Sequence, residues 1–263
     1  MKRYDLEQFL HDVYHYDMFD DYCYNGLQVE GSEEINTILF GVSFNALLLE
    51  EAIRKNVDAI LVHHGIFGKD LFKIHEPFKK SLYQLLHKNI SLFGIHLPMD
   101  AHPEIGNNAE LARMIGGILL EPVHVGFLVE NTRNLSFMQI IHSYHKELDP
   151  ESSSTPPSPL SPLHYKYLGN IQYYDFGPDT PKKIGILSGG GSRYIPDYQS
   201  HGADTYITGD IKEHLPAYLY DYHMNFINLG HYRSEKTGIL ALKKRIETTF
   251  SVSCLYCDIY NPI

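Results

Sequence analysis

The sequence predicts an α/β protein made of two similar α/β domains. Short apolar runs alternate with segments whose apolar residues recur at helical spacing. The same order of strands and helices occurs twice along the chain, whose 263 residues suffice for one large domain or two small ones. Alternation of this kind favours mostly parallel sheets that helices cover.

The first copy opens with an apolar strand over residues 38–42. Asn45 can cap the following helix, because its short polar side chain accepts hydrogen bonds from backbone N–H groups. The apolar positions of that helix recur at helical spacing: Leu48, Ala52 and Ile53. A second strand over residues 58–64 ends in the pair His63 and His64. The copy closes with a helix over 78–89 and a strand over 90–95 that runs into His96.

The second copy repeats this order after residue 183. Its expected elements are the strand 184–187, the glycine loop 189–191, a helix through Tyr194 and Tyr198, the strand 204–208, the helix 214–223 and the strand 226–230, which runs into His231. Asp58 and Asp204 occupy the same place in the two copies, each opening an apolar run. We expect a first domain of residues 1–126 plus 225–263 and a second of 127–224, interrupted by a mobile Ser/Pro-rich insertion at about 149–162.

Ligand-type side chains follow the ends of these strands, where ligands bind in parallel sheets. Besides the His63-His64 pair, they are His96, Asp100, Asp210, His231 and Glu235. Imidazoles and carboxylates bind divalent metal ions, so we interpret the set as one metal centre. Neighbouring residues of a regular strand diverge, so the His63-His64 pair would ligate two ions or bend around one.

Two of these spacings differ in what they predict. His231 and Glu235 share one side if the segment is helical. Between His96 and Asp100, Pro98 makes a helix unfavourable, so a loop would have to turn both side chains inward. Asp210 mirrors His64, yet it could equally cap the helix that follows.

Composition excludes several classes of function. The net charge of -10 and the pI near 5.8 argue against a general binder of nucleic acid or anionic membranes. Neither a signal peptide nor an apolar run of the ~18 residues that a membrane span needs is evident, and three cysteines fit a reducing cytoplasm. Cys254 and Cys257 fall on an expected strand, where side chains three apart face opposite ways, so we expect no disulfide or zinc pair. The glycine loop at 189–191 lacks the Lys-Ser/Thr of a P-loop, so it is only a weak signal for nucleotide binding.

As a set, five motifs resemble the NGG-one-interacting-factor-three-like family, whose bacterial members are often labelled GTP cyclohydrolase type 2 homologues. They are VHHGIF (62–67), GIHLPMDAHP (94–103), GNN (106–108), ITGD (207–210) and GHYRSE (230–235). The resemblance implies two similar, intertwined α/β domains, a dinuclear metal site in the cleft between them and a ring-shaped homohexamer. The ligands it implies are His63, His64, Asp100, His231 and Glu235. His96 would lie close by as an extra ligand or proton carrier. The family usually has Thr in place of Ser234 and often Glu in place of Asp210.

With this resemblance, our first hypothesis is a hydrolase that acts on a small, nucleotide-like substrate and binds two divalent ions of zinc, iron or manganese per chain. Glu235 would hold or bridge the ions, and His96 would pass a proton to the leaving group. A metal-binding, metal-delivering or interaction protein without turnover is the alternative. An activity on DNA is the third hypothesis, because an acidic chain does not attract the phosphate backbone.

Overall fold

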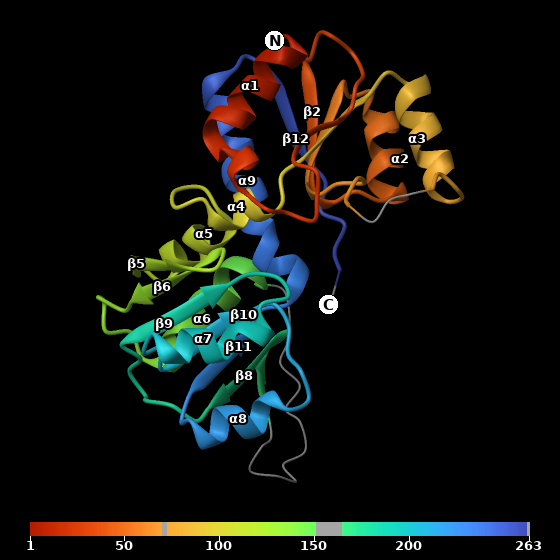
Figure 1. Cartoon of the computed structure of the whole chain (residues 1–263). Helices are drawn as coiled ribbons and strands as arrows, with labels where there is room; N and C mark the ends of the chain where they lie inside the picture. The colour runs from red at the N-terminus through yellow and green to blue at the C-terminus, as the bar shows by residue number, and fades with distance from the viewer. Residues whose placement is uncertain (70–72, 151–164, 262–263) are drawn as a thin grey trace. The chain divides into compact units, whose positions relative to one another are not determined.

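Figure 1 shows a computed structural model of the chain, which describes residues 1–69, 73–150 and 165–261. The expected Ser/Pro-rich insertion at 149–162 lies outside these residues except for its first two positions. The chain forms two compact units. The first consists of Met1–Met99 and Gly238–Tyr260, and the second of Asp100–Thr237 together with Asn261.

The first unit is built on a five-stranded sheet of order β1-β4-β3-β2-β12. Its strands are β1 (Gly26–Val29), β2 (Thr37–Ser43), β3 (Ala59–His64), β4 (Ser91–Gly94) and β12 (Ser253–Tyr256). Neighbours pair in parallel except for β1, which lies antiparallel to β4. The carboxyl ends of the parallel strands therefore share one edge of this sheet, where β3 ends at His64.

Helices cover both faces of this sheet, with α1 (Arg3–Tyr14) on one face and α2 (Ala46–Lys55) and α3 (Phe78–His87) on the other (Figure 1). The expected cap of α2 is confirmed, because the Asn45 side chain accepts a hydrogen bond of 3.0 Å from the backbone N–H of Leu48. Alternate strand residues face α2 and α3. The resulting core contains Leu39, Ile60, Val62 and Leu92 from the sheet and Leu48, Leu49, Ala52 and Leu85 from the two helices.

The second unit contains a seven-stranded sheet of order β5-β6-β9-β10-β11-β8-β7. Its strands are β5 (Ile118–Val123), β6 (Gly126–Glu130), β7 (Lys166–Leu168), β8 (Ile171–Asp175), β9 (Lys183–Leu187), β10 (Thr205–Thr208) and β11 (Asn225–Asn228). Only β9, β10 and β11 pair in parallel, and every other neighbour is antiparallel. The expected mostly parallel arrangement thus holds for the first sheet but only for the centre of the second.

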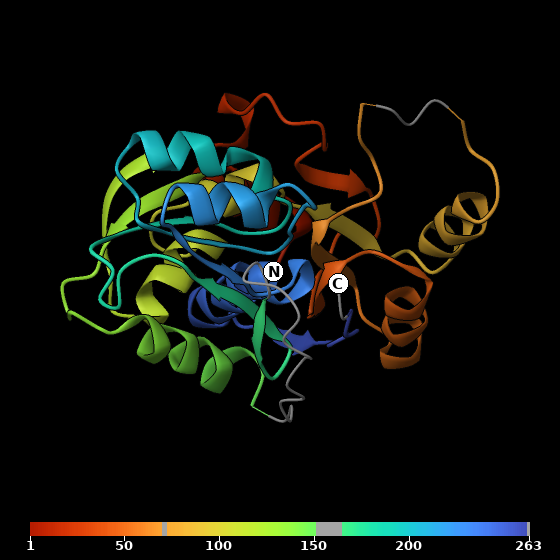
Figure 2. The same cartoon turned by 90° about the horizontal axis from the view of Figure 1, so that it is seen from below.

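Two apolar cores flank this second sheet because side chains alternate along each strand. Ile207 and Ile227 join a core with α5 (Asn107–Met114) and α6 (Phe137–Leu148). Their neighbours Tyr206 and Phe226 join a core on the other face, with α7 (Ile195–Ser200) and α8 (Leu215–Asp221). Figure 2 shows α6 on one side of the strands and α7 and α8 on the other.

The repeated plan is confirmed in the hydrogen bonds of Asp58 and Asp204. The Asp58 carboxylate accepts from the backbone of Thr37, the first residue of β2, at 2.9 Å, and the Asp204 carboxylate accepts from Lys182, just before β9, at 2.8 Å. The backbone of each aspartate also joins the strands on either side. Asp58 donates to the Thr37 carbonyl and accepts from the Ser91 N–H, and Asp204 donates to the Lys183 carbonyl and accepts from the Asn225 N–H. Each aspartate therefore fixes the same junction of three parallel strands.

The bounds of the two units differ from the expected ones. Residues 100–126 and 225–237 belong to the second unit, because β5 pairs with β6 and β11 pairs with β10. Both divisions fall within helices, namely α4 (Leu97–Ala101) and α9 (His231–Thr249). Across the described ranges, no helix has the length and apolar character needed to cross a membrane.

Candidate metal centre

Three imidazoles come together in the first unit, two at the end of β3 and one after β4. The potential ligand atoms of His63, His64 and His96 all lie within 4.8 Å of one another. The ring centroids are 4.5 Å apart for His63 and His64, 5.1 Å for His63 and His96, and 5.4 Å for His64 and His96. The end of β3 thus turns neighbouring side chains toward each other, although residues within a regular strand diverge.

Hydrogen bonds fix two of these rings from behind. The buried His63 ring places Nδ1 2.9 Å from the carbonyl oxygen of Ile95. A carbonyl only accepts, so Nδ1 carries the proton and Nε2 carries the lone pair that a metal ion needs. His64 places its Nδ1 2.9 Å from the hydroxyl of Ser43.

His96 is held by a loop that precedes β1. Its backbone N–H donates to Asn25 Oδ1 at 2.7 Å, and its Nδ1 lies 2.8 Å from Asp21 Oδ1. Burial favours the neutral form of the Asp21 carboxyl, but the hydrogen bonds from His96 and Asn25 outweigh it and lower the pKa of Asp21 to about 2. Asp21 is therefore a carboxylate at neutral pH.

Asp100, the expected carboxylate ligand, belongs to the second unit and is oriented there by two donors. Its Oδ1 accepts from Asn107 Nδ2 at 2.8 Å and from Ser188 Oγ at 2.9 Å. Asn108 supports the same arrangement, since its amide donates to the Asp100 backbone carbonyl at 3.1 Å and its oxygen accepts from the Ser188 backbone N–H at 2.7 Å. Both asparagines of the GNN motif therefore set the position of Asp100.

His231 and Glu235 lie in the first turn of α9, also in the second unit, and the helical spacing expected for them is confirmed. His231 Nε2 lies 3.1 Å from Glu235 Oε1. The glycine loop passes directly beside them, since a Cβ built on Gly189 would lie 2.1 Å from that carboxylate oxygen. Ser234 joins the loop to the helix, accepting from the Gly189 backbone N–H and donating to the His231 carbonyl, both at 2.9 Å.

The structure corrects the expectation for the segment after His96 and decides between the two roles expected for Asp210. The segment after His96 is the short helix α4, so the expectation of a loop there was wrong. Pro98 lies in its first turn, where a missing N–H does no harm. Asp210 accepts hydrogen bonds from the backbone and hydroxyl of Ser192, at 2.8 and 2.7 Å. It therefore fixes the glycine loop, and no group of potential ligands among the described residues includes it.

Sequence reasoning missed Asp21, Cys23 and Asn25. Ligand atoms of Asp21, Cys23 and His96 also lie within 4.8 Å of one another, so the loop before β1 belongs to the surroundings of the imidazoles. The sequence signal was the polar spacing Asp21-x-Cys23-x-Asn25 directly before a strand. Cys254 lies on β12 (Ser253–Tyr256) and Cys257 directly follows it, and both are free thiols.

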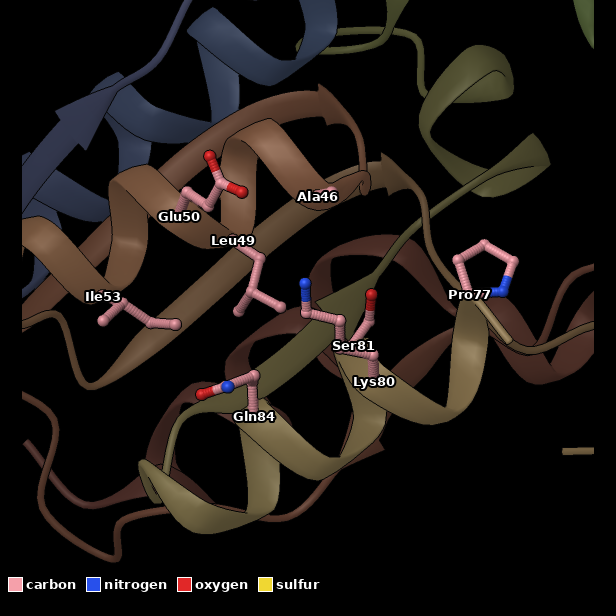
Figure 3. A pocket seen from close by; sticks show the side chains of 8 residues that line it. All are labelled: Ala46, Leu49, Glu50, Ile53, Pro77, Lys80, Ser81 and Gln84. Atoms are coloured by element: carbon pink, nitrogen blue, oxygen red, sulfur yellow. The ribbon is translucent and has the colours of Figure 1, made fainter. Parts of the chain in front are cut away.

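A groove of about 440 Å³ lies between α2 and α3 (Figure 3). Leu49 and Ile53 form part of its apolar wall, and Lys80 and Gln84 of α3 lie opposite them. Among the described residues that line it, Glu50 is the one ligand-type side chain. The groove therefore shares no residue with the histidine cluster, and one carboxylate is too little to hold a metal ion.

Comparisons with known proteins agree with these motifs. The chain is 32% identical to an Escherichia coli K12 protein over an alignment of 268 positions, gaps included, and 34% identical to one from Haemophilus influenzae over 271. Each relative is named GTP cyclohydrolase 1 type 2 homolog, and both chains of each pair are fully covered. Among solved structures, it is similar to protein ybgI (TM-score 0.87, 31% identity) and to TTHA1606 from Thermus thermophilus (TM-score 0.85, 27% identity), again with full coverage. Residues 1–262 match the family described as Duf34/NIF3 (NGG1p interacting factor 3), and the chain belongs to that family.

Proposed function

We propose that this protein binds two divalent metal ions and uses them to hydrolyse a small, nucleotide-like substrate. The proposed ligands are His63, His64, Asp100, His231 and Glu235. The observation that carries the proposal is the cluster of three imidazoles in the first unit, whose ligand atoms lie within 4.8 Å of one another. Imidazole is the commonest metal-binding side chain, so three imidazoles with ligand atoms this close together favour a metal site.

The donor atoms fit divalent ions of the transition series. Imidazole nitrogens combined with carboxylate oxygens suit zinc, iron or manganese. The ligands are also oriented as metal ligands usually are, by hydrogen bonds at the atom that does not bind the ion. His63 is held through Nδ1 by Ile95, and Asp100 is held through Oδ1 by Asn107 and Ser188.

Bound metal ions would supply an activated water and would polarise the bond to be cleaved. Glu235 would hold the ions, and His96 would carry a proton to the leaving group. The substrate class comes from the name of the relatives, GTP cyclohydrolase 1 type 2 homolog. Hydrolytic opening of a purine imidazole ring and cleavage of a phosphate ester are the two reactions that this chemistry supports.

The further features of the proposal come from the family resemblance and from composition. A ring-shaped homohexamer is the proposed assembly. The proposed compartment is the cytoplasm, since all three cysteines are free thiols.

Metal content tests the proposed centre directly. Purified protein should contain about two equivalents of zinc, iron or manganese per chain by elemental analysis. Glu235→Ala should lose at least one equivalent while the far-ultraviolet circular dichroism stays unchanged. Glu247→Ala is the matched control, because Glu247 lies on the same helix with a side chain 39% exposed and paired with Lys243. Unchanged metal content in Glu235→Ala would refute the assigned role of Glu235.

Turnover is tested by screening nucleotides and phosphate esters with wild-type protein and His63→Ala. The proposal predicts activity that the variant loses. Activity that persists in the variant would come from a contaminant or another site. Stoichiometric metal without turnover on any compound would instead favour the alternative, a non-catalytic metal-binding or metal-delivery protein.

A further inference from the structure

We propose that Asp21 is a positioning residue that fixes His96 in one orientation and one tautomer, with Nε2 presented for metal binding or proton transfer. This inference rests on the proposed metal centre and extends it to a residue outside the ligand set. It concerns the first unit alone, since Asp21 and His96 both belong to it.

Asp21 is the centre of a small, nearly closed network of hydrogen bonds. Its side chain accepts from four donors and is only 5% exposed. Oδ1 accepts from the Cys23 backbone N–H at 3.1 Å and lies 2.8 Å from His96 Nδ1, while Oδ2 accepts from Asn25 Nδ2 and the Leu97 backbone N–H, both at 3.0 Å. The side-chain oxygen of Asn25 also accepts a hydrogen bond from the His96 backbone N–H at 2.7 Å. The loop therefore holds the backbone of His96 through Asn25 and its ring through Asp21.

The chemistry of this contact determines which nitrogen of His96 can act. A carboxylate has no proton to donate, so His96 Nδ1 must donate to Asp21. The lone pair of the neutral ring then lies on Nε2, the nitrogen farther from Asp21. A carboxylate behind an imidazole orients the ring and makes the other nitrogen a better ligand or base, and removing such a partner typically weakens metal binding by about 10–100-fold.

A separate metal site on Asp21, Cys23 and His96 is the competing interpretation of the same group. The hydrogen bonds of Asp21 disfavour it. Both oxygens of Asp21 already accept two hydrogen bonds each, so an ion would have to displace donors that also shape the loop.

The tautomer of His96 tests the geometry without any metal. In metal-free protein labelled with ¹⁵N-histidine at pH 8, long-range ¹H–¹⁵N spectra distinguish the two neutral tautomers, and His96→Gln identifies the His96 signals by their loss. We expect the Nδ1–H tautomer in the wild type and a mixture in Asp21→Asn. A wild-type His96 protonated on Nε2 would overturn the proposal, whether or not any variant folds.

Metal affinity tests the consequence. Asn offers one acceptor oxygen where Asp offers two, so Asp21→Asn cannot keep both the His96 and the Leu97 contacts. Competition with a chromogenic chelator should show zinc bound about 10–100-fold more weakly by Asp21→Asn. Asp20→Asn is the matched control, because Asp20 has a side chain 95% exposed and paired with Lys69. It should bind zinc as the wild type does.

A double-variant comparison separates positioning from a purely structural role. If Asp21 acts through His96, adding Asp21→Asn to His96→Gln should weaken zinc binding no further. A full additional loss in that background would overturn the proposal. Wild-type protein that binds no zinc would refute the metal centre itself, and the tautomer measurement would still decide the role of Asp21.

Discussion

Replacing Gly189 with alanine is expected to displace the Glu235 carboxylate while the fold survives. Gly189 has a φ of +63°, a left-handed conformation that costs an L residue about 1–2 kcal/mol. The added Cβ would lie 2.1 Å from Glu235 Oε1 and 3.2 Å from His231 Nε2. To reach ordinary van der Waals separation, the carboxylate oxygen must move by more than about 1 Å. Such a shift is well beyond the roughly 0.2 Å that metal–ligand distances tolerate.

Thermal unfolding and elemental analysis of the same preparation test this reasoning. Gly189→Ala should lower the free energy of unfolding by about 1–3 kcal/mol and should lose at least one equivalent of metal. Gly190→Ala is the matched control in the same loop, because its Cβ would meet only His231 Cε1, at 3.8 Å. We expect wild-type metal content for it. Gly189→Ala protein that is folded and retains both metal equivalents would refute the link between the glycine loop and Glu235.

Two further predictions concern the cysteines and the assembly. Burial, helped by the charge of Glu247, raises the pKa of Cys254 to about 11. At pH 8 its thiolate should therefore be about 100-fold scarcer than that of a thiol with the ordinary pKa near 9. Alkylation followed by mass spectrometry should show correspondingly slow labelling of Cys254 until the protein is denatured. Because the folded-state pKa of this thiol lies above its unfolded-state pKa, its contribution to stability is fully present below pH 9 and is lost progressively as the pH rises toward 11. Labelling of Cys254 in the folded protein as fast as in the denatured protein would contradict the raised pKa. Light scattering coupled to size exclusion should give six times the chain mass of 30.2 kDa, and a monomeric mass would refute the homohexamer.

The repeated unit was predictable because its signals are local. Strand alternation, helical spacing and the cap at Asn45 depend on residues within a few positions of one another. Asp58 and Asp204 were recognised as equivalent from their place before an apolar run, and each proves to join three parallel strands. The end of β3 at His63 and His64, and the place of His231 shortly after β11, followed from the same patterns.

The extension of the second sheet was not predictable from this repeat. On one side of the parallel strands, β6 pairs antiparallel with β9 and β5 pairs antiparallel with β6. On the other side, β8 pairs antiparallel with β11 and β7 pairs antiparallel with β8. Nothing in the composition of a short strand says which existing edge it will join. Sequence reasoning therefore assigned residues 100–126 to the first domain, whereas their pairing assigns them to the second unit.

His96 differs from His102 in what holds Nδ1, and this difference is invisible in the spacing. His96 and His102 occur in the same motif, six residues apart, and both precede short polar or helical segments. His102 Nδ1 accepts from the backbone N–H groups of Glu104 and Ile105, at 3.1 and 3.2 Å, so that nitrogen is deprotonated and serves a local turn. His96 Nδ1 instead meets the carboxylate of Asp21, which lies 75 positions earlier in the chain. Residue type and spacing identify His96 as a candidate metal ligand. Its long-range hydrogen-bond partner decides which ring nitrogen can bind a metal ion, and only the folded structure supplies that partner.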